Sequence, residues 1–464
     1  MCELDRTDHI LATRMVPPVL RMALARDIVP SVVIKSFSIH PLAVADPPLR
    51  SSYGLHAPYA LRTVIRLETT DGISGAAEAH GGEGSVAALE AIRKHVLGMD
   101  PFALHALWMR WGAGENSGDR SQTWLVPGEN PADARRRAFA AVEAACLDII
   151  GKAVGKPVCD LLGGRARDAA PFSAYLFYKH AGGGGEGADA RVDEYGECLT
   201  PESIVRQCRQ MIGRYGFREI KLKGGVLEPE VEIRTVRLLR EEFGPSCPLR
   251  IDPNCAWSVE TSVRVGLALK EELSGGGYLE DPTAGLDGMA EVRRRLLKAG
   301  ADIPLASNVA VTGFEHVVPA WRTGAAQVIL SDPHYWGGIR AVQRLGDLCE
   351  NLGLGLSMHS NTHLGLSLLI MAHSCCATPW MKFACDTHYP WQQEKDEILA
   401  GGRVKFDHGS VRIPDRPGLG AEIDWDQVAR LEERYRKLPY RKRDDAEEMR
   451  KRVDPAWKRV VPRW

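Results

Sequence analysis

The sequence lacks an excess of either charge. Its 464 residues carry 59 Lys and Arg against 60 Asp and Glu, so bulk charge does not favour a nucleic acid as a partner. Long apolar runs are also missing. The longest, residues 364–377, is interrupted by Gly, Ser and His and is too short to span a bilayer. We therefore expect neither a nucleic-acid partner nor a membrane partner.

The cysteines lack the order that a disulfide scaffold or a zinc site requires. Eleven cysteines occur without a repeating spacing, and Cys375 and Cys376 are adjacent. An odd number of cysteines in a long chain favours reduced thiols, so we expect a cytoplasmic protein. Separately, we expect the protein to be a homo-oligomer. Residues 1–30 lack the uninterrupted apolar core of a leader peptide, and we interpret them as a loosely ordered extension.

Three strands followed by helices are predicted in the first third of the chain. Apolar residues alternate in residues 32–44, 61–67 and 73–79, with a turn at Asp71-Gly72, which indicates an antiparallel meander. The apolar period becomes helical in residues 85–97 and 133–154. We predict an α+β capping domain over residues 31–168.

A repeated strand and helix unit dominates the rest of the sequence. Short apolar runs end at Lys223, Asp252, Glu280 and Asn308, and the steps between these residues are close to the length of one strand, one crossover helix and two loops. Further strands are predicted at residues 172–178, before Asp332 and His359, and at residues 381–385. Eight such strands predict a (β/α)₈ barrel over residues 169–404. Residues 405–464 are expected to pack back on the capping domain.

Three of the strand ends carry oxygen donors. Asp252, Glu280 and Asn308 end successive strands, and the C-terminal ends of barrel strands converge. Each residue alone would more often be a strand-terminating turn, but three in register favour a hard divalent cation, most plausibly Mg²⁺.

Two further groups suggest proton transfer. Lys221 and Lys223 lie two residues apart on one strand and so share a face, where burial and mutual repulsion would lower their pKa values as a lysine base requires. The alternative is a solvated edge strand. His359 has Asp332 on the adjacent strand to fix its tautomer, which makes it a second candidate base. His388 is a weaker candidate, because a loop histidine is often solvated.

Taken together, these residues resemble the enolase superfamily and, more narrowly, the D-glucarate dehydratase family. The resemblance runs from about residue 32 to residue 445 and rests on the following segments: Lys221-Leu-Lys223-Gly-Gly, Asp252-Pro-Asn254, Glu280-Asp-Pro, Ser307-Asn308, Asp332-Pro-His334, His359-Ser360-Asn361, Asp386-Thr-His388 and Pro417-Gly-Leu-Gly420. An asparagine as the third metal ligand is specific to that family.

The resemblance implies a mechanism and a substrate. Mg²⁺ on Asp252, Glu280 and Asn308 would bind one carboxylate of a hexarate, a six-carbon dicarboxylate acid sugar. His359, oriented by Asp332, would take the α-proton of one epimer, and Lys223 that of the other. Lys221 would hold and polarise the carboxylate, and Asn254 would join the catalytic set. The residues that the resemblance assigns to substrate binding are His56, Thr123, Tyr175, Lys221, Ser360, Asn361, His388 and Arg443.

Two alternatives stay open. The first is a dehydratase or an epimerase of another acid sugar, which the same two bases would serve. The second, from a different functional class, is a non-catalytic paralogue that binds an acid or a partner protein. The segment after Glu280-Asp-Pro, residues 283–288, is shorter than in well-known members of the family, and we expect residues 285–290 to alter the rim of the pocket.

Overall fold

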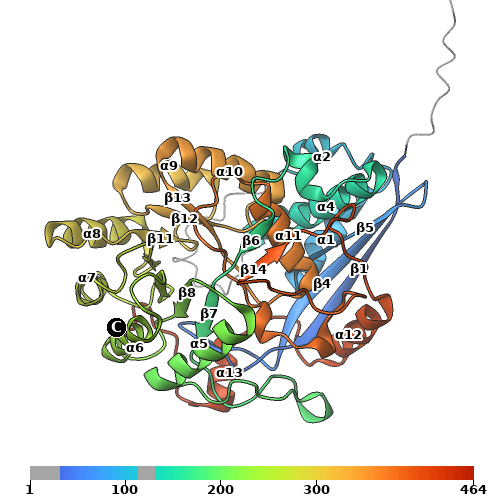
Figure 1. Cartoon of the computed structure of the whole chain (residues 1–464). Coiled ribbons are helices and arrows are strands. Elements are labelled where there is room, and N and C mark those ends of the chain that lie inside the picture. Colours follow the sequence, from blue (N-terminus) through green and yellow to red (C-terminus); the bar gives the residue numbers. More distant parts are fainter. Residues whose placement is uncertain (1–31, 113–130) are drawn as a thin grey trace, which may run out of the picture.

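The computed structural model describes residues 32–112 and 131–464. Two bodies lie side by side in Figure 1: a barrel with an outer ring of helices, and a sheet with helices packed on it. In the described part of the chain no helix has the length and apolarity to cross a membrane. The ten cysteines in this part are all free thiols.

The first body is the predicted antiparallel meander. Its sheet has the order β1-β4-β5, formed by Ile34–Ala45, Tyr59–Thr69 and Ser74–His80. Gly72, with φ of 90°, makes the tight turn between β4 and β5. A short hairpin of β2 (Arg50–Ser51) and β3 (Gly54–Leu55) is inserted between β1 and β4. The predicted strands are therefore confirmed.

Helices cover one face of this sheet. They are α1 (Glu83–Val96), α2 (Leu104–Trp111) and α4 (Pro131–Val154). Phe139, Val142, Cys146 and Ile149 of α4 are buried, as the helical period predicts. Helix α4 packs directly on β5, so the sheet and the helices enclose one core.

The second body is a parallel barrel with strands in sequence order. The strands are β7 (Ala174–Phe177), β8 (Ile220–Lys223), β9 (Leu249–Asp252), β10 (Tyr278–Glu280), β11 (Leu305–Ser307), β12 (Val328–Ser331) and β13 (Gly355–Met358). The helices outside them are α5 (Pro201–Tyr215), α6 (Pro229–Phe243), α7 (Val259–Ala268), α8 (Gly285–Lys298), α9 (Phe314–Thr323), α10 (Ile339–Leu352) and α11 (Gly365–Cys376). This alternation is the architecture of a TIM-like barrel.

The predicted eighth strand, residues 381–385, is not a regular strand. The backbone N–H groups of Lys382 and Phe383 both donate to the carbonyl of Leu356, at 3.0 and 3.2 Å. Two successive residues thus pair with one residue of β13, as in a β-bulge, and the regular strand pairing is interrupted. The segment still closes the barrel. Asp386 N donates to Met358 O at 2.8 Å on one side, and Ser173 N donates to Cys385 O at 2.9 Å on the other.

The last part of the chain returns to the first body. Strand β14 (Ser410–Arg412) pairs with β6 (Ala169–Pro171). Helix α12 (Trp425–Lys437) packs on β1, where Tyr435 joins Ala43 and Ala45 in a small apolar cluster. Helix α13 (Asp445–Arg452) packs on β3. The numerical limits of the domains stay predictions.

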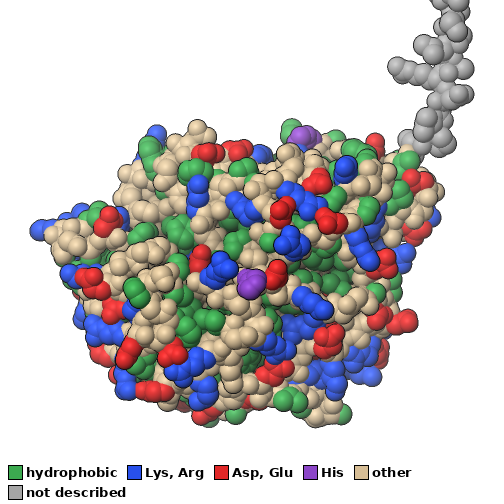
Figure 2. Space-filling view, in the orientation of Figure 1, with side chains coloured by type: hydrophobic (Ala, Val, Ile, Leu, Met, Phe, Trp, Pro, Cys, Tyr) green, Lys and Arg blue, Asp and Glu red, His purple; other side chains and the backbone are tan. Residues whose placement is uncertain are grey.

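Short 3₁₀ turns complete the described structure. They are η1 (Val158–Leu162), η2 (Gly187–Asp189), η3 (Tyr389–Trp391) and η4 (Glu394–Asp396). The buried carboxylate of Asp396 in η4 accepts from Ala45 N at 2.8 Å, Arg191 Nη2 at 2.8 Å and Arg434 Nη1 at 2.9 Å, which ties the barrel to both β1 and α12. The outer surface seen in Figure 2 mixes basic and acidic side chains, in keeping with the balanced composition.

A buried histidine makes stability depend on pH. His373 of α11 accepts from Cys159 N through Nδ1 and donates from Nε2 to Leu419 O, both at 3.3 Å, and burial lowers its pKa from 6.5 to about 4. The unfolded chain therefore binds the proton more readily between these two values. This contribution to stability is complete above pH 6.5 and is lost as the pH falls towards 4.

We expect the free energy of unfolding to fall by about 2 kcal/mol from this residue between pH 7 and pH 5. Chemical denaturation at both pH values measures the change. His373→Gln should flatten the dependence by about that amount, whereas His408→Asn, at an exposed histidine, should leave it as in the unmodified protein. An unaltered slope in His373→Gln would contradict the assignment.

Candidate active site

The predicted oxygen donors meet at one end of the barrel. Asp252 and Glu280 are the last residues of β9 and β10, and Asn308 directly follows β11. All three are buried, and Asn308 Nδ2 lies 3.2 Å from Glu280 Oε1. Among the described residues, no three His, Cys, Asp or Glu side chains form a metal cluster; the predicted triad has only two residues of those types.

Lys221 lies at the centre of the buried carboxylates. Its Nζ is 2.6 Å from Asp386 Oδ2, 2.6 Å from Glu280 Oε2 and 3.4 Å from Asp252 Oδ2. Burial pushes the pKa of Lys221 down, but the carboxylates of Asp386 and Glu280 outweigh it and raise that pKa well above its usual value. The predicted lowering of the pKa is therefore wrong for Lys221, because the sequence interpretation counted the neighbouring lysine but not these carboxylates.

The donor set fits a divalent cation. Burial and the Asp252 carboxylate raise the pKa of Glu280 well above its usual range, although Lys221 Nζ lies only 2.6 Å from its Oε2. Such crowding means that positive charge at this place is insufficient for the carboxylates present. Two carboxylates and an amide oxygen are the ligands that Mg²⁺ prefers.

Lys223 and Asn254 both contact Asp252. Lys223 Nζ donates to Asp252 Oδ2 at 2.7 Å, and Asn254 N donates to Asp252 Oδ1 at 3.0 Å. Burial acts against ionisation, but the ammonium groups of Lys223 and Lys221 hold the pKa of Asp252 below its usual range. Tyr175 of β7 adds a hydroxyl, which donates to Asp252 Oδ2 at 3.3 Å.

His359 is paired with Asp332, its neighbour on the preceding strand. His359 Nδ1 lies 3.1 Å from Asp332 Oδ2, and both residues are buried. Although burial alone would raise it, the imidazoles of His334 and His359 hold the pKa of Asp332 below its usual range. A carboxylate only accepts hydrogen bonds, so Nδ1 of His359 carries the hydrogen and Nε2 is the nitrogen that can accept a proton.

Six of the eight predicted substrate-binding residues line one small pocket, and Lys221 lies beneath it among the buried carboxylates and is not part of its wall. Its walls are Ser51, Tyr53, His56, Tyr175, Phe177, Lys223, Asn254, Asn308, His359, Ser360, Asn361, His388 and Arg443. Within it, His56 Nδ1 lies 2.9 Å from Asp46 Oδ2, Ser360 Oγ 2.8 Å from His388 Nδ1, and Asn361 Nδ2 2.9 Å from Tyr335 Oη. Arg443 forms a two-pronged ion pair with Asp445, at 2.6 Å for each bond. Thr123 lies outside the described residues.

Two expectations about the pocket need correction. His388 is buried and not solvated, and burial followed by the neighbouring His56 lowers its pKa well below the usual value, so its ring is neutral. Residues 285–290 form the first turns of α8, and none of them is among the described residues that line the pocket.

Three functional carboxylates escaped the sequence analysis. Asp281 accepts from Ser307 Oγ at 2.6 Å and from Asn308 N at 2.8 Å, and so fixes the end of β11. Asp386 pairs with Lys221, and Asp46 orients His56. Asp386 lies in the segment Asp386-Thr-His388, in which the sequence analysis assigned a role only to His388. Asp46 precedes two prolines and gives no signal in the sequence.

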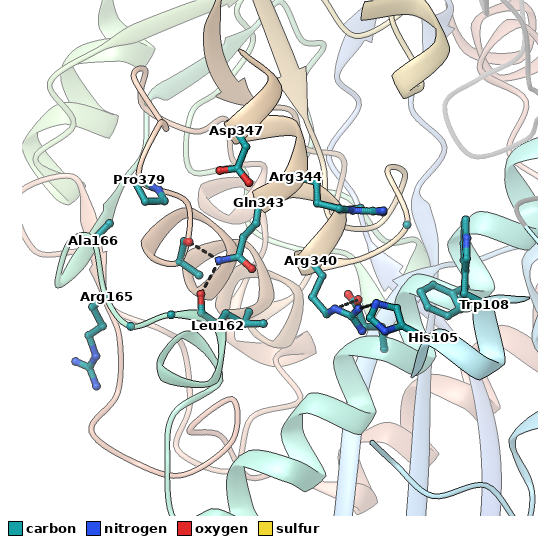
Figure 3. Close-up of a pocket in the computed structure, with 17 residues that line it drawn as sticks. His105, Trp108, Leu162, Arg165, Ala166, Arg340, Gln343, Arg344, Asp347 and Pro379 are labelled. Carbon is teal, nitrogen blue, oxygen red and sulfur yellow. Dashed lines mark hydrogen bonds and ion pairs between the residues drawn. The ribbon is translucent and has the colours of Figure 1, made fainter. Parts of the chain in front are cut away.

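Larger cavities lie outside this pocket, whose free volume is about 30 Å³. One of about 310 Å³ adjoins it through Asn361 and Arg443 and is bordered by Arg62, Arg137 and Arg441. Another, of about 610 Å³, lies between α2 and α4 on one side and α10 on the other, where Arg340 reaches towards His105 (Figure 3). It contains none of the predicted site residues.

We expect Asp281→Ala to destabilise the protein. The substitution leaves two backbone N–H groups and the Ser307 hydroxyl without their buried acceptor, and each buried group left unsatisfied costs about 1–3 kcal/mol. Urea denaturation would measure the loss. Asp302→Ala removes a carboxylate that is 80% exposed and serves as the control. Equal stability of the two variants would contradict the role given to Asp281.

Comparison with known proteins agrees with this geometry. A family model described as "Enolase C-terminal domain-like" matches residues 203–427, and one described as "Mandelate racemase / muconate lactonizing enzyme, N-terminal domain" matches residues 38–163. A protein of Streptomyces coelicolor named probable glucarate dehydratase is 43% identical over 443 residues, which cover 93% of this chain and 99% of that protein.

Solved structures give the same result. An enolase from Thermobispora bispora complexed with magnesium and formate is 44% identical, with a TM-score of 0.85 and coverage of 94% of this chain and 100% of that one. An enolase from Pseudomonas fluorescens with bound magnesium, potassium and tartrate is 40% identical, again with a TM-score of 0.85 and coverage of 94% and 100%. The chain therefore belongs to the enolase superfamily and, within it, to the glucarate dehydratase-like enzymes.

Proposed function

We propose that this glucarate dehydratase-like enzyme is a Mg²⁺-dependent dehydratase of a hexarate, D-glucarate and also L-idarate, that forms a 5-keto-4-deoxy acid. The observation that carries the proposal is the position of two candidate bases in one pocket. Lys223 comes from the second strand of the barrel and His359 follows the seventh, and both line the pocket that also contains Asn254 and Asn308.

The proton transfers follow from this arrangement. Nε2 of His359 removes the proton α to one carboxylate of one epimer, while Asp332 holds the hydrogen on Nδ1. Lys223, as the neutral amine, removes the α-proton of the other epimer, and in that case His359 must already carry a proton on Nε2 to give to the leaving hydroxyl. The hydroxyl on the next carbon then leaves as water with a proton from His359, and the resulting enol rearranges to the ketone.

Asp252, Glu280 and Asn308 would hold the metal ion. When bound, Mg²⁺ supplies positive charge that stabilises the anion formed when the α-proton leaves. Lys221, an ammonium group fixed by Asp386 and Glu280, adds a second positive charge beside the substrate carboxylate.

Recognition of a dicarboxylate is supported by the other polar side chains that line the pocket. His56, Tyr175, Ser360, Asn361 and His388 offer hydroxyl, amide and imidazole groups to the hydroxyls of an acid sugar. Arg443 is placed for the far carboxylate, and the adjoining cavity is bordered by further arginines. The free volume of the pocket is too small for six carbons, so the covering side chains must move apart when the substrate enters.

Epimerisation of an acid sugar is the second candidate. Two bases in one pocket permit removal of a proton from one face of a carbon and its return to the other. A non-catalytic binding protein is disfavoured, because every predicted metal and base position retains a suitable side chain.

Product analysis would test the substrate and the reaction. Glucarate, idarate and galactarate are incubated with enzyme and Mg²⁺, and the products are identified by NMR. We expect a ketodeoxy acid from glucarate and idarate. A product that differs from its substrate only in configuration would favour the epimerase, and no conversion of any hexarate would reject the proposal.

Two substitutions would test the two-base arrangement. His359→Asn should stop exchange of the α-proton with D₂O for one epimer and spare the other, and Lys223→Arg should do the reverse, because each base serves one face. Each exchange is followed by ¹H NMR. Equal loss of both exchanges in each variant would mean that a single base acts.

Metal removal gives an independent test. We expect EDTA to abolish turnover and Mg²⁺ to restore it, and Asn308→Leu to weaken Mg²⁺ binding measured by calorimetry, since one oxygen ligand is lost. Asn351→Leu, at an exposed helix residue far along the chain from the triad, should bind Mg²⁺ as the unmodified enzyme does. Unchanged turnover after chelation would contradict the assignment.

A further inference from the structure

Asp332 is shared by two histidines. Its Oδ2 accepts a hydrogen bond from His359 Nδ1 at 3.1 Å. Its Oδ1 accepts two hydrogen bonds from His334, one from the backbone N and one from Nδ1, each at 2.8 Å. The backbone contact belongs to the turn Asp332-Pro333-His334 and needs no particular side chain at 334. The ring contact is a separate bond, which only a side chain with an N–H at that place can make.

The other side of the His334 ring is fixed as well. His334 Nε2 lies 2.8 Å from Ser367 Oγ, and Ser367 N donates to the buried carboxylate of Glu78 at 2.9 Å. Because a carboxylate only accepts hydrogen bonds, Nδ1 of His334 carries the hydrogen that bonds Asp332, and Nε2 is the atom that pairs with the Ser367 hydroxyl. Ser367 and His334 are buried with Asp332 and His359, so the chain of bonds is shielded from water.

We propose that His334 is a positioning residue for the His359 base. A carboxylate attached through a single sp³–sp² bond has a broad torsional preference and is easily rotated. A second imidazole on Oδ1, itself held from α11, restricts that rotation and keeps Oδ2 directed at His359 Nδ1. This inference rests on the proposed function, because it assigns His334 to one of the two proton transfers.

The role is confined to one half of the reaction. Lys223 contacts Asp252, on a different strand from Asp332. Loss of the His334 contact should therefore slow exchange of the proton that His359 removes and leave the proton that Lys223 removes unaffected. A general weakening of the fold would slow both.

Two substitutions at the same position separate the contacts of the ring. In His334→Asn the side-chain N–H₂ can stand near the place of Nδ1 and donate to Asp332, but it does not reach Ser367. In His334→Gln the amide extends towards Ser367 and leaves Oδ1 of Asp332 with the backbone bond alone. His363→Asn is the matched control, because His363 is equally buried and is bonded to Thr387 Oγ1 at 3.1 Å rather than to Asp332.

The measurement is exchange of the α-proton in D₂O for each epimer, together with the ¹H resonance of the His359 Nδ1–H, which requires no substrate. In His334→Gln we expect the His359-dependent exchange to fall roughly tenfold or more, as loss of a charge-assisted hydrogen bond implies, and the resonance to shift upfield. His334→Asn and His363→Asn should retain both. Ser367→Ala should show a smaller fall in the same exchange.

Three results would overturn the inference: an equal fall of both exchanges in His334→Gln, no change in that variant, or His334→Asn being as impaired as His334→Gln. If the unmodified enzyme exchanges no hexarate proton, the proposed function fails, and the Nδ1–H resonance alone then decides whether His334 positions the pair.

Discussion

The buried ammonium group of Lys221 is the interaction on which the active end of the barrel depends. It brings Asp386, Glu280 and Asp252 within 3.4 Å of one positive charge. Without the Lys221 ammonium, three buried carboxylates would repel one another and would also have lost their hydration. The free energy of that state is far higher than a pair of surface charges could offset. The same crowding keeps the site short of positive charge, which is the condition under which a divalent cation binds tightly. The lysine and the proposed metal ligands thus form one electrostatic unit.

Much of this arrangement could be predicted from the sequence, because strand ends are periodic. The residues that end the apolar runs after residue 219 are the residues that converge, since parallel strands in a barrel direct their C-terminal ends to one place. The meander was equally readable, since its alternation and its Asp71-Gly72 turn are local signals. His359 and Asp332 belong to the same class, because neighbouring strands imply neighbouring side chains.

The remainder depends on contacts between distant segments, which no local pattern encodes. The raised pKa of Lys221 comes from Asp386, which lies 165 residues further along the chain. His56 is oriented by Asp46, and that carboxylate is also approached by the Thr362 hydroxyl at 3.2 Å. The eighth strand takes its predicted place but is irregular, for a related reason. Its pairing with Leu356 is decided by how the barrel closes and not by the apolar character of residues 381–385.

The pocket draws its walls from both bodies and from the segment that follows the barrel, and these walls include His56 early in the chain and Arg443 near its end. This has a consequence for how the enzyme is made. The two residues are 387 positions apart, which at about 5–20 residues per second corresponds to roughly 20–80 s of synthesis. A nascent chain can complete its meander and most of its barrel during that time, yet it has no closed pocket. A chain cut short within α12 would contain the meander and the barrel but would lack Arg443 from the wall of the pocket.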